Sequence, residues 1–223
     1  LRLSRGLGDV YKRQSKNRNL LLIDSGAQYL EGTTDITRVI KIGAKNLSRI
    51  KFSYTYLLKS LIRIENKIFP RKIRTFEIDL FVRKYLSKFN ISYNHGTGHG
   101  VGNFGDVHEK YPIISSRSKD ILVKNALFSI EPGYYVEGQF GLRIENLYVT
   151  KNINNSLKLK NITLVPYDLD LVDFKLITNF ERNYIKKYQP TPNHERLNKI
   201  VEDIIKSGRI QKDDLTIVVV DGI

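Results

Sequence analysis

The feature that most constrains this chain is a glycine- and histidine-rich stretch from Asn94 to Glu109, NHGTGHGVGNFGDVHE. It holds three of the four histidines in the 223 residues, namely His95, His99 and His108. These histidines lie among glycines and not along an apolar face, and glycine lets backbone approach a site without a Cβ clash. The stretch therefore indicates a functional site in which imidazole groups lie beside backbone that approaches the site closely.

The composition narrows the classes of protein to consider. Hydrophobic residues make up 41% and aromatic residues 10%, as in a globular protein of one or two domains. No apolar run reaches the roughly 18 residues of a membrane span, which predicts a soluble protein without a membrane partner. The absence of cysteine excludes disulfides, zinc–thiolate sites and a cysteine nucleophile, and it fits a cytoplasmic location. Any metal site must therefore consist of carboxylates and imidazoles.

The formal charge of +14 raises the alternative of a basic nucleic-acid binder. The first 19 residues supply +5 of this charge, which leaves +9 for the remainder. The other lysines are scattered, and no basic motif interleaved with aromatic residues occurs. Scattered basic residues are typical of a solvated surface, so a nucleic-acid partner is disfavoured. Salt-dependent retention on DNA would test this alternative.

The first residues look foreign to the rest of the chain. Residues 1–14 show neither a hydrophobic period nor a helix cap, and the segment DVYKRQ (Asp9–Gln14) resembles the translation of a sequencing-transposon end. A presequence should be serine-rich and amphipathic, and this segment is neither. Residues 1–14 are therefore predicted to be a non-native tail derived from a sequencing adapter.

Short strands and helices alternate along the chain, with hairpins between them, which predicts an α+β fold. The predicted strands are Asn19–Asp24, Asp35–Ile42, Ala126–Val136, Gly141–Thr150 and Leu157–Val165. A turn-rich loop is predicted over Ser25–Thr34, a hairpin turn at EGQF and another turn at Asn152–Asn155. The tail Asp213–Ile223 is strand-like, and it is left open whether it is an added strand or a second foreign junction.

Apolar residues at intervals of three to four predict the helices. These are Asn46–Ile68, ended by Pro70; a helix capped by Thr75 with an inner face of Ile78, Val82, Tyr85 and Phe89; Ile177–Tyr188; and Asn193–Ser207.

Four acidic residues occupy unusual settings in this pattern. Asp24 ends one predicted strand and Asp35 begins the next, while Glu131 and Glu145 are flanked by apolar strand residues. A lone carboxylate is costly to bury in such places, and bound cations would remove the cost. Two divalent ions shared by these acids and His99 would provide that compensation.

The ligand types favour Mn²⁺, Co²⁺ or Fe²⁺, with Zn²⁺ as a further option. Two such ions roughly 3.5 Å apart can hold a bridging hydroxide and polarise a carbonyl. Taken singly, a buried acidic residue is more often a capped or paired structural residue than a ligand, and a histidine is more often an ordinary hydrogen-bonding residue. A phosphate-binding loop is not supported, because HGTGHGVG has neither a Walker lysine nor the G-x-G-x-x-G spacing.

Four segments carry a family resemblance: DSGAQYLEGTTDITR, NHGTGHGVGNFGDVHE, SIEPGYYVEGQFGLRIEN and ITLVPYDLDLVD. Together they resemble the catalytic domain of Xaa-Pro aminopeptidase (aminopeptidase P), a pita-bread metallopeptidase related to prolidase and methionine aminopeptidase. The resemblance is continuous from about Asn19 to Tyr188. It implies the pita-bread fold, two divalent ions, most consistent with Mn²⁺, and peptide substrates with proline in second position. A homodimer is left open.

The resemblance also implies roles for individual residues. Asp24 would bind one metal ion, Asp35 and Glu145 would bridge both ions, and His99 and Glu131 would complete the pair. His95 and His108 would hold the substrate and shuttle protons. The catalytic set would comprise His95, His108, Glu131, Arg143 and Tyr135, where Arg143 pairs with a carboxylate ligand and Tyr135 hydrogen-bonds nearby.

The same resemblance implies an incomplete enzyme. Residues 15–156 would be a partial catalytic domain that lacks part of its first half, and residues 157–223 the C-terminal extension of the long form. The parent would remove the N-terminal residue before proline by attack of a metal-bound hydroxide on the X-Pro carbonyl, and this piece alone would be weak or inactive. The match is weak after Tyr188.

Two alternatives remain within the same fold. Prolidase cleaves X-Pro dipeptides with a similar site, but the HGTGHGVG spelling, the step from His99 to His108 and the extension favour the aminopeptidase. A non-catalytic pita-bread binding module typically loses its metal ligands. All five ligand positions here are acidic residues or histidine, which favours the enzyme lineage.

Overall fold

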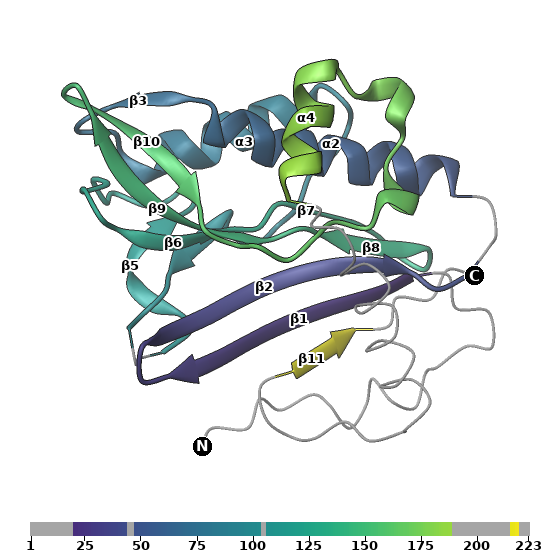
Figure 1. Cartoon of the computed structure of the whole chain (residues 1–223), viewed down its shortest axis with the longest axis horizontal. Helices are drawn as coiled ribbons and strands as arrows, with labels where there is room; N and C mark the ends of the chain where they lie inside the picture. Colours follow the sequence, from purple (N-terminus) through teal and green to yellow (C-terminus); the bar gives the residue numbers. More distant parts are fainter. Residues whose placement is uncertain (1–19, 44–46, 104–105, 189–214, 219–223) are drawn as a thin grey trace.

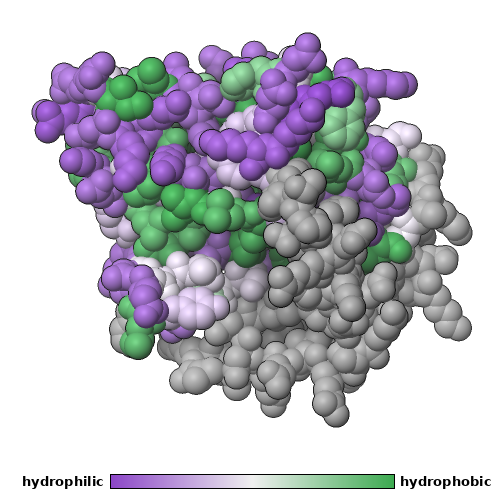
Figure 2. Space-filling view, viewed as in Figure 1, coloured by the Kyte–Doolittle hydropathy of each residue, from purple (hydrophilic) through white to green (hydrophobic). Residues whose placement is uncertain are grey.

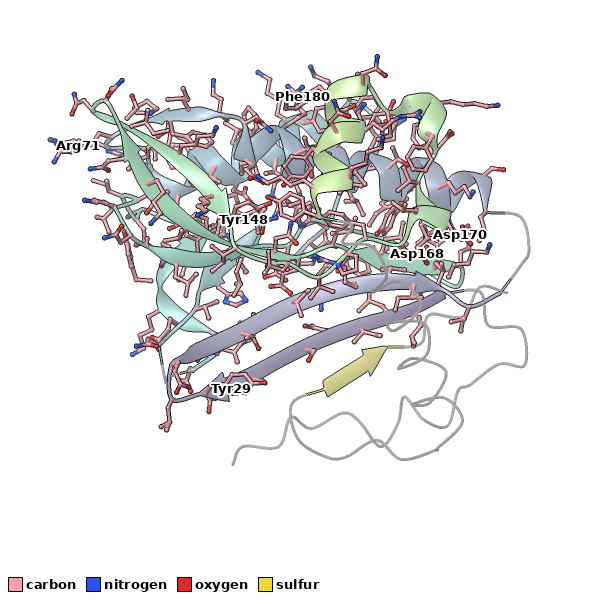
Figure 3. All side chains as sticks on the ribbon, viewed as in Figure 1. Tyr29, Arg71, Tyr148, Asp168, Asp170 and Phe180 are labelled. Carbon is pink, nitrogen blue, oxygen red and sulfur yellow. The ribbon has the colours of Figure 1, made fainter. Side chains whose placement is uncertain are left out.

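The computed structural model describes residues 20–43, 47–103, 106–188 and 215–218 (Figure 1). Within these ranges every pairing between strands is antiparallel, which confirms the predicted α+β class. Three helices lie on one side of a six-stranded sheet, and a long hairpin runs along the opposite side (Figure 1). The largest fully buried side chains include Tyr54, Phe128 and Tyr148, and Tyr148 lies in the interior of the molecule (Figure 3).

The long hairpin consists of β1 (Leu20–Tyr29) and β2 (Gly32–Lys41), joined by a two-residue turn. The loop predicted over Ser25–Thr34 is therefore wrong, because the strands continue through most of it. The ladder includes the pairs Gly26↔Asp35 and Gln28↔Thr33. Turn-forming residues in this segment suggested a loop, but alternate residues of β2 are buried, and this period of two stabilises an extended strand.

The six-stranded sheet has the order β3 (Ile68–Pro70), β10 (Ser156–Asn161), β9 (Asn146–Ile153), β6 (Leu127–Ile130), β4 (Gly98–Gly100) and β5 (Glu109–Ile114). A separate hairpin pairs β7 (Gly133–Val136) with β8 (Phe140–Arg143) and confirms the predicted EGQF turn. The predicted turn between β9 and β10 is also confirmed. It contains Asn154 and Asn155, both with positive φ, a conformation that asparagine tolerates well.

Two predicted strands are each interrupted at an acidic residue. The predicted strand Ala126–Val136 breaks between β6 and β7 at Glu131, and the predicted strand Gly141–Thr150 breaks between β8 and β9 at Glu145. At each break the backbone bonds to another element. The Glu131 N–H donates to the Thr97 carbonyl at 2.8 Å, and the Glu145 N–H donates to the Thr37 carbonyl at 3.1 Å. The predicted strand Leu157–Val165 likewise ends earlier, with β10 at Asn161.

The helices α2 (Ser48–Glu65), α3 (Thr75–Ser87) and α4 (Asn179–Lys187) form the layer over the sheet, and two short 3₁₀ turns (η2, Leu169–Leu171; η3, Phe174–Leu176) precede α4. Hydrophilic residues cover much of this side in Figure 2. Two predicted details are wrong. Ile68 belongs to β3 and not to the first helix, and Thr75 is the first residue of α3 and not its cap. Arg74 precedes α3, and its N–H donates to the Glu77 carboxylate at 3.0 Å.

The inner face of α3 is close to the prediction. Ile78, Val82 and Leu86 are buried, while Tyr85 and Phe89 pack at the edge of the core.

Some predictions concern parts of the chain that the structure does not describe. The predicted foreign tail (residues 1–14) and the predicted helix Asn193–Ser207 lie outside the described residues. Of the tail Asp213–Ile223, residues Leu215–Val218 form β11, which pairs with β1. The domain boundary predicted after residue 156 stays a prediction. It falls at the first residue of β10, the strand that pairs with β9. In the described ranges, no helix combines the length and apolarity that a membrane span needs.

Candidate metal centre

The hairpin brings the first two predicted ligands to one face. Asp24 lies opposite Thr37 in the ladder, and Asp35 precedes Thr37 by two residues. Because alternate residues of a strand point to the same side, Asp24 and Asp35 lie on the same face as diagonal neighbours. The neighbouring pair on that face, Leu22 and Val39, is buried in the core. The hydrophobic face of the hairpin therefore continues directly into a polar cluster.

His99 is placed by a three-residue strand between two neighbours. It lies on β4, which pairs with β5 on one side and β6 on the other. A Cβ atom at Gly98 would overlap the carbonyl oxygen of Ser129, and one at Gly100 would overlap that of Tyr111. Glycine on each side of His99 is therefore required by the close approach of the adjacent strands.

The ligand atoms of Asp35, His99 and Glu145 lie within 4.8 Å of one another. His99 Nε2 is 3.4 Å from Asp35 Oδ2 and 3.5 Å from Glu131 Oε1. Asp24 lies close by, with its carboxylate paired to the guanidinium of Arg143. The structure thus brings the five predicted ligands into one cluster from β1, β2, β4 and the two strand breaks.

The tautomer of His99 suits metal binding. Its Nδ1 is 2.9 Å from the carbonyl oxygen of Gly100, which can only accept, so Nδ1 carries the hydrogen in the neutral ring. Nε2 is then a free lone pair directed at the acidic residues. Burial lowers the pKa of His99, so the neutral ring is favoured.

The acidic residues of the cluster repel one another. Burial raises the pKa of Asp35, and the charges of Glu145 and Asp24 raise it further. Burial also raises the pKa of Glu131 and of Glu145, with neighbouring carboxylates adding to both. Arg143 opposes these increases but supplies only one positive charge. The cluster therefore favours either bound protons or bound cations.

One atom gives a direct test of whether cations fit. Glu145 is 2% exposed, and its Oε2 accepts a hydrogen bond from Thr37 at 2.8 Å. Its Oε1 is buried and accepts no hydrogen bond from any residue that the structure describes. Leaving a buried carboxylate oxygen without a partner costs about 1–3 kcal/mol or more. A divalent cation beside this oxygen would satisfy it, and four carboxylates with one imidazole are a suitable donor set for two such ions.

The other predicted residues form a chain of hydrogen bonds beside the cluster. His95 Nδ1 is 2.7 Å from the Gly96 carbonyl oxygen, and its Nε2 is 3.0 Å from Tyr135 Oη. Arg143 Nη1 donates to the same Tyr135 oxygen at 3.5 Å. Burial lowers the pKa of His95. His95 is thus held as a neutral ring whose hydrogen is on Nδ1, and it connects through Tyr135 to the arginine that pairs with Asp24.

His108 approaches the cluster from a more exposed position. Its ring centroid lies 4.1 Å from that of His99, with the rings tilted by 42°. The histidines of the glycine-rich stretch thus occupy distinct places. His99 lies among the carboxylates, His108 lies over His99, and His95 stands apart with Tyr135.

Sequence reasoning missed two residues that hold the cluster together. Thr37 donates to Glu145 and accepts a hydrogen bond from Arg143 Nε at 3.0 Å. Arg38 donates to the Glu145 carbonyl oxygen at 2.5 Å and to Asn146 Oδ1 at 2.8 Å. The available signal was a threonine two residues after Asp35, which places a second polar side chain on the buried face of β2.

Replacing Thr37 with valine should destabilise the metal-free protein by about 1–3 kcal/mol, because Oε2 of Glu145 loses the hydrogen bond that Thr37 donates while valine keeps the shape. Affinity for divalent ions should fall about 10- to 100-fold, as is usual when a partner of a metal ligand is removed. Urea unfolding and calorimetric metal titration measure the two effects. Thr34→Val, an exposed change on the same strand, is the control and should alter neither. Equal metal affinity in wild type and Thr37→Val would contradict a role for Thr37 in holding Glu145.

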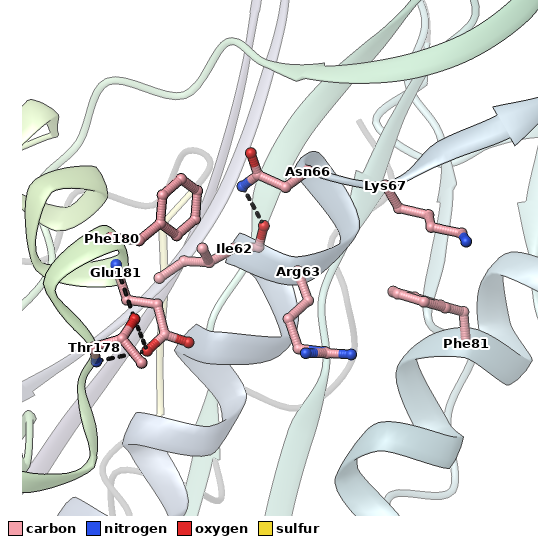
Figure 4. Close-up of a pocket in the computed structure, with 8 residues that line it drawn as sticks. All are labelled: Ile62, Arg63, Asn66, Lys67, Phe81, Thr178, Phe180 and Glu181. Carbon is pink, nitrogen blue, oxygen red and sulfur yellow. Dashed lines mark hydrogen bonds between the residues drawn. The ribbon is translucent and has the colours of Figure 1, made fainter.

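A cavity of about 350 Å³ lies elsewhere, between α2, α3 and α4. Figure 4 shows its walls, which include Arg63, Phe81 and Phe180. None of the predicted site residues lines it, so this cavity is separate from the candidate metal centre.

Comparison with known proteins agrees with this geometry. The family model of metallopeptidase family M24 matches residues 8–152. A probable Xaa-Pro aminopeptidase P of Podospora anserina is 38% identical over 208 residues, which are 88% of this chain and 29% of the relative. A protein of the same name from Fusarium vanettenii is 36% identical over 209 residues, covering 89% of this chain and 32% of the relative. The chain thus spans about a third or less of the length of these relatives.

Solved structures give the same result for the fold. An X-prolyl aminopeptidase from Caenorhabditis elegans, described as a cytosolic enzyme with a di-nuclear active site, is similar with a TM-score of 0.71 and 33% identity. The similarity covers 86% of this chain and 32% of that one. A prolidase from Thermococcus sibiricus is similar with a TM-score of 0.57 and 31% identity, covering 68% and 39%. The predicted pita-bread fold is confirmed over the matched part. The chain belongs to metallopeptidase family M24.

Proposed function

We propose that this chain carries the dinuclear metal centre of an Xaa-Pro aminopeptidase, which removes the N-terminal residue from peptides with proline in second position. The observation that carries the proposal is the buried cluster of Asp35, His99 and Glu145, in which one oxygen of Glu145 has no partner among the described residues. The C. elegans neighbour, an X-prolyl aminopeptidase, is described as having a di-nuclear active site. The names of the fungal relatives support the same substrate class.

In this proposal Asp24 would hold one ion, Asp35 and Glu145 would each serve both ions, and His99 and Glu131 would complete the set. Mn²⁺ fits the oxygen-rich donor set, with Co²⁺, Fe²⁺ or Zn²⁺ as alternatives. When bound, two divalent ions lower the pKa of a water molecule and polarise a carbonyl group. A cytoplasmic location is part of the proposal.

The remaining site residues would handle the substrate. The nitrogen of an X-Pro bond has no hydrogen and must gain a proton when it leaves, so an imidazole acid suits the reaction. We assign that work to His95 and His108. The hydrogen bonds from Arg143 to Tyr135 and between Tyr135 and His95 fix the orientation of the His95 ring. Glu131, beside His99, would act both as a ligand and in proton transfer.

Prolidase activity is the second candidate, because solved prolidases share the fold with this chain. The two activities differ in what they accept after proline. With Mn²⁺ supplied, an aminopeptidase should cleave tripeptides of the form X-Pro-Y in preference to X-Pro dipeptides. A preference for the dipeptide would overturn the aminopeptidase proposal in favour of prolidase.

Turnover by this 223-residue chain alone should be weak relative to a full-length relative, because it spans only 29% of the P. anserina protein and residues from the remainder would be absent from the substrate site. The measurement is kcat/KM on an X-Pro-Y peptide with Mn²⁺ for both proteins. Equal values would contradict this expectation and would indicate that the described cluster suffices for catalysis.

A further inference from the structure

An ion pair on α3, between a half-buried arginine and a buried aspartate, holds the backbone beside His95. Arg83 Nε donates to both carboxylate oxygens of Asp79, at 2.8 and 2.9 Å. The other two nitrogens of the same guanidinium donate to backbone carbonyls, Nη1 to Tyr93 at 2.7 Å and Nη2 to His95 at 2.6 Å. The guanidinium also lies 4.1 Å from the centre of the Tyr93 ring. One arginine therefore fixes both ends of the segment from 93 to 95.

Asp79 connects this arginine to the metal side of the site. It is 1% exposed, and its Oδ1 accepts a hydrogen bond from Thr97 Oγ1 at 2.5 Å. The Thr97 carbonyl in turn accepts the N–H of Glu131 at 2.8 Å. Thr97 is itself fully buried and hydrogen-bonds to Tyr93 through its hydroxyl. The Asp79 carboxylate is thus linked through Arg83 to His95 and through Thr97 to Glu131.

We infer that Asp79 and Arg83 are positioning residues, which set the His95 ring relative to the carboxylates of the metal centre. The catalytic consequence rests on the proposed function, but the effect on His95 does not. The planar guanidinium is essential here, because it reaches a carboxylate and two separate carbonyls at once, whereas the single ammonium of lysine cannot. The carbonyl of His95 is held by Arg83, while the ring of the same residue contacts Gly96 and Tyr135.

A simple structural role for this pair makes a different prediction. If the pair only anchored α3 to the loop, replacing Arg83 would lower stability and leave the surroundings of His95 unchanged. If it positions His95, the ring should change its environment even in the folded variant, while the metal ligands, held by β1, β2, β4 and the strand breaks, should keep their affinity.

The test compares Arg83→Lys and Arg83→Gln with the control Lys84→Gln, an exposed change on the same helix. The imidazole ¹H–¹⁵N correlations of the metal-free protein report the His95 ring, with its signals assigned from a His95→Gln variant. Calorimetric titration with Mn²⁺ reports the metal centre, and thermal unfolding reports stability. Arg83→Lys retains the charge and the helix propensity, so it decides the test if Arg83→Gln does not fold.

We expect the His95 correlations to shift or broaden in Arg83→Lys, with Mn²⁺ affinity within about threefold of wild type and no change in Lys84→Gln. Where wild type turns over an X-Pro-Y peptide, kcat should fall about 10- to 100-fold with a smaller change in KM, since misplacing a catalytic group costs about this much. Unchanged His95 signals in a folded Arg83→Lys protein would overturn the inference. If wild type binds no Mn²⁺, the proposed function fails, while the spectra of the metal-free protein still decide the positioning role.

Discussion

The metal-free protein should become less stable as the pH rises from about 4 to about 8, by about 2 kcal/mol or more. Burial raises the pKa of Asp35 and of Glu131 to about 8, above their ordinary values of 3.8 and 4.5. Between the ordinary and the raised values, the folded protein binds more protons than the unfolded chain. The folded protein therefore has its full stability at acidic pH and loses stability as the pH rises through the raised pKa values. This trend is opposite to that of a carboxylate stabilised by a salt bridge.

Chelator-treated protein, unfolded with urea at pH 5, 6, 7 and 8, measures this loss. Adding Mn²⁺ should reverse the trend, because bound cations replace the protons and bind most tightly when the carboxylates are ionised. The gain in stability on adding Mn²⁺ should therefore be larger at pH 8 than at pH 5. If the stability of the metal-free protein stays constant or increases from pH 5 to pH 8, repulsion among the acidic residues of the cluster does not destabilise the folded protein.

Glu145→Gln should have opposite effects on the metal-free and the metal-bound protein. Without metal, the change removes a buried negative charge next to Asp35 and Glu131, so the variant should be as stable as wild type or more stable at pH 8. With Mn²⁺, the variant should lack the stabilisation that wild type gains. Any turnover by wild type should fall at least about 10³-fold, because an ion that polarises the scissile carbonyl contributes several kcal/mol.

The matched control is Glu137→Gln, an exposed glutamate in the turn between β7 and β8. Urea unfolding without Mn²⁺ measures the stability of the metal-free variant, and urea unfolding with Mn²⁺ measures the stabilisation that the ion adds. A Glu145→Gln protein that is stabilised by Mn²⁺ as strongly as wild type would remove Glu145 from the metal centre. A variant that is much less stable than wild type without metal would mean that Glu145 has a structural role and not the repulsive one inferred here.

The residues of the candidate site could be predicted from the sequence more completely than the fold that supports them. Asp24, Asp35, Glu131 and Glu145 could be selected because a carboxylate among apolar strand residues needs compensation, whatever the exact strand boundaries. The long β1–β2 hairpin was not predicted, since glycine and threonine between residues 25 and 34 suggested a loop, and only the partner strand shows that they pair. The strand breaks at Glu131 and Glu145 likewise depend on distant acceptors, Thr97 and Thr37.

The supporting residues were beyond single-sequence reasoning for the same reason. Thr37 and Glu145 are 108 residues apart, and nothing local to either reveals their hydrogen bond. Asp79 and Arg83 are spaced as an ordinary i, i+4 pair on a helix, a pattern typical of solvent-exposed faces. Only the arrangement of α3 against the His95 segment shows that this pair is directed inward.

The central claim is that five side chains hold two divalent ions, and the number of bound ions per chain tests it most directly. Chelator-treated wild type and Asp35→Asn are equilibrated with Mn²⁺ at pH 8, freed of unbound metal and analysed for metal per chain, with Asp106→Asn, an exposed carboxylate near His108, as the control. We predict two ions in wild type and in the control, and no more than one in Asp35→Asn, because a bridging carboxylate serves both ions. Equal metal content in wild type and Asp35→Asn would contradict the claim.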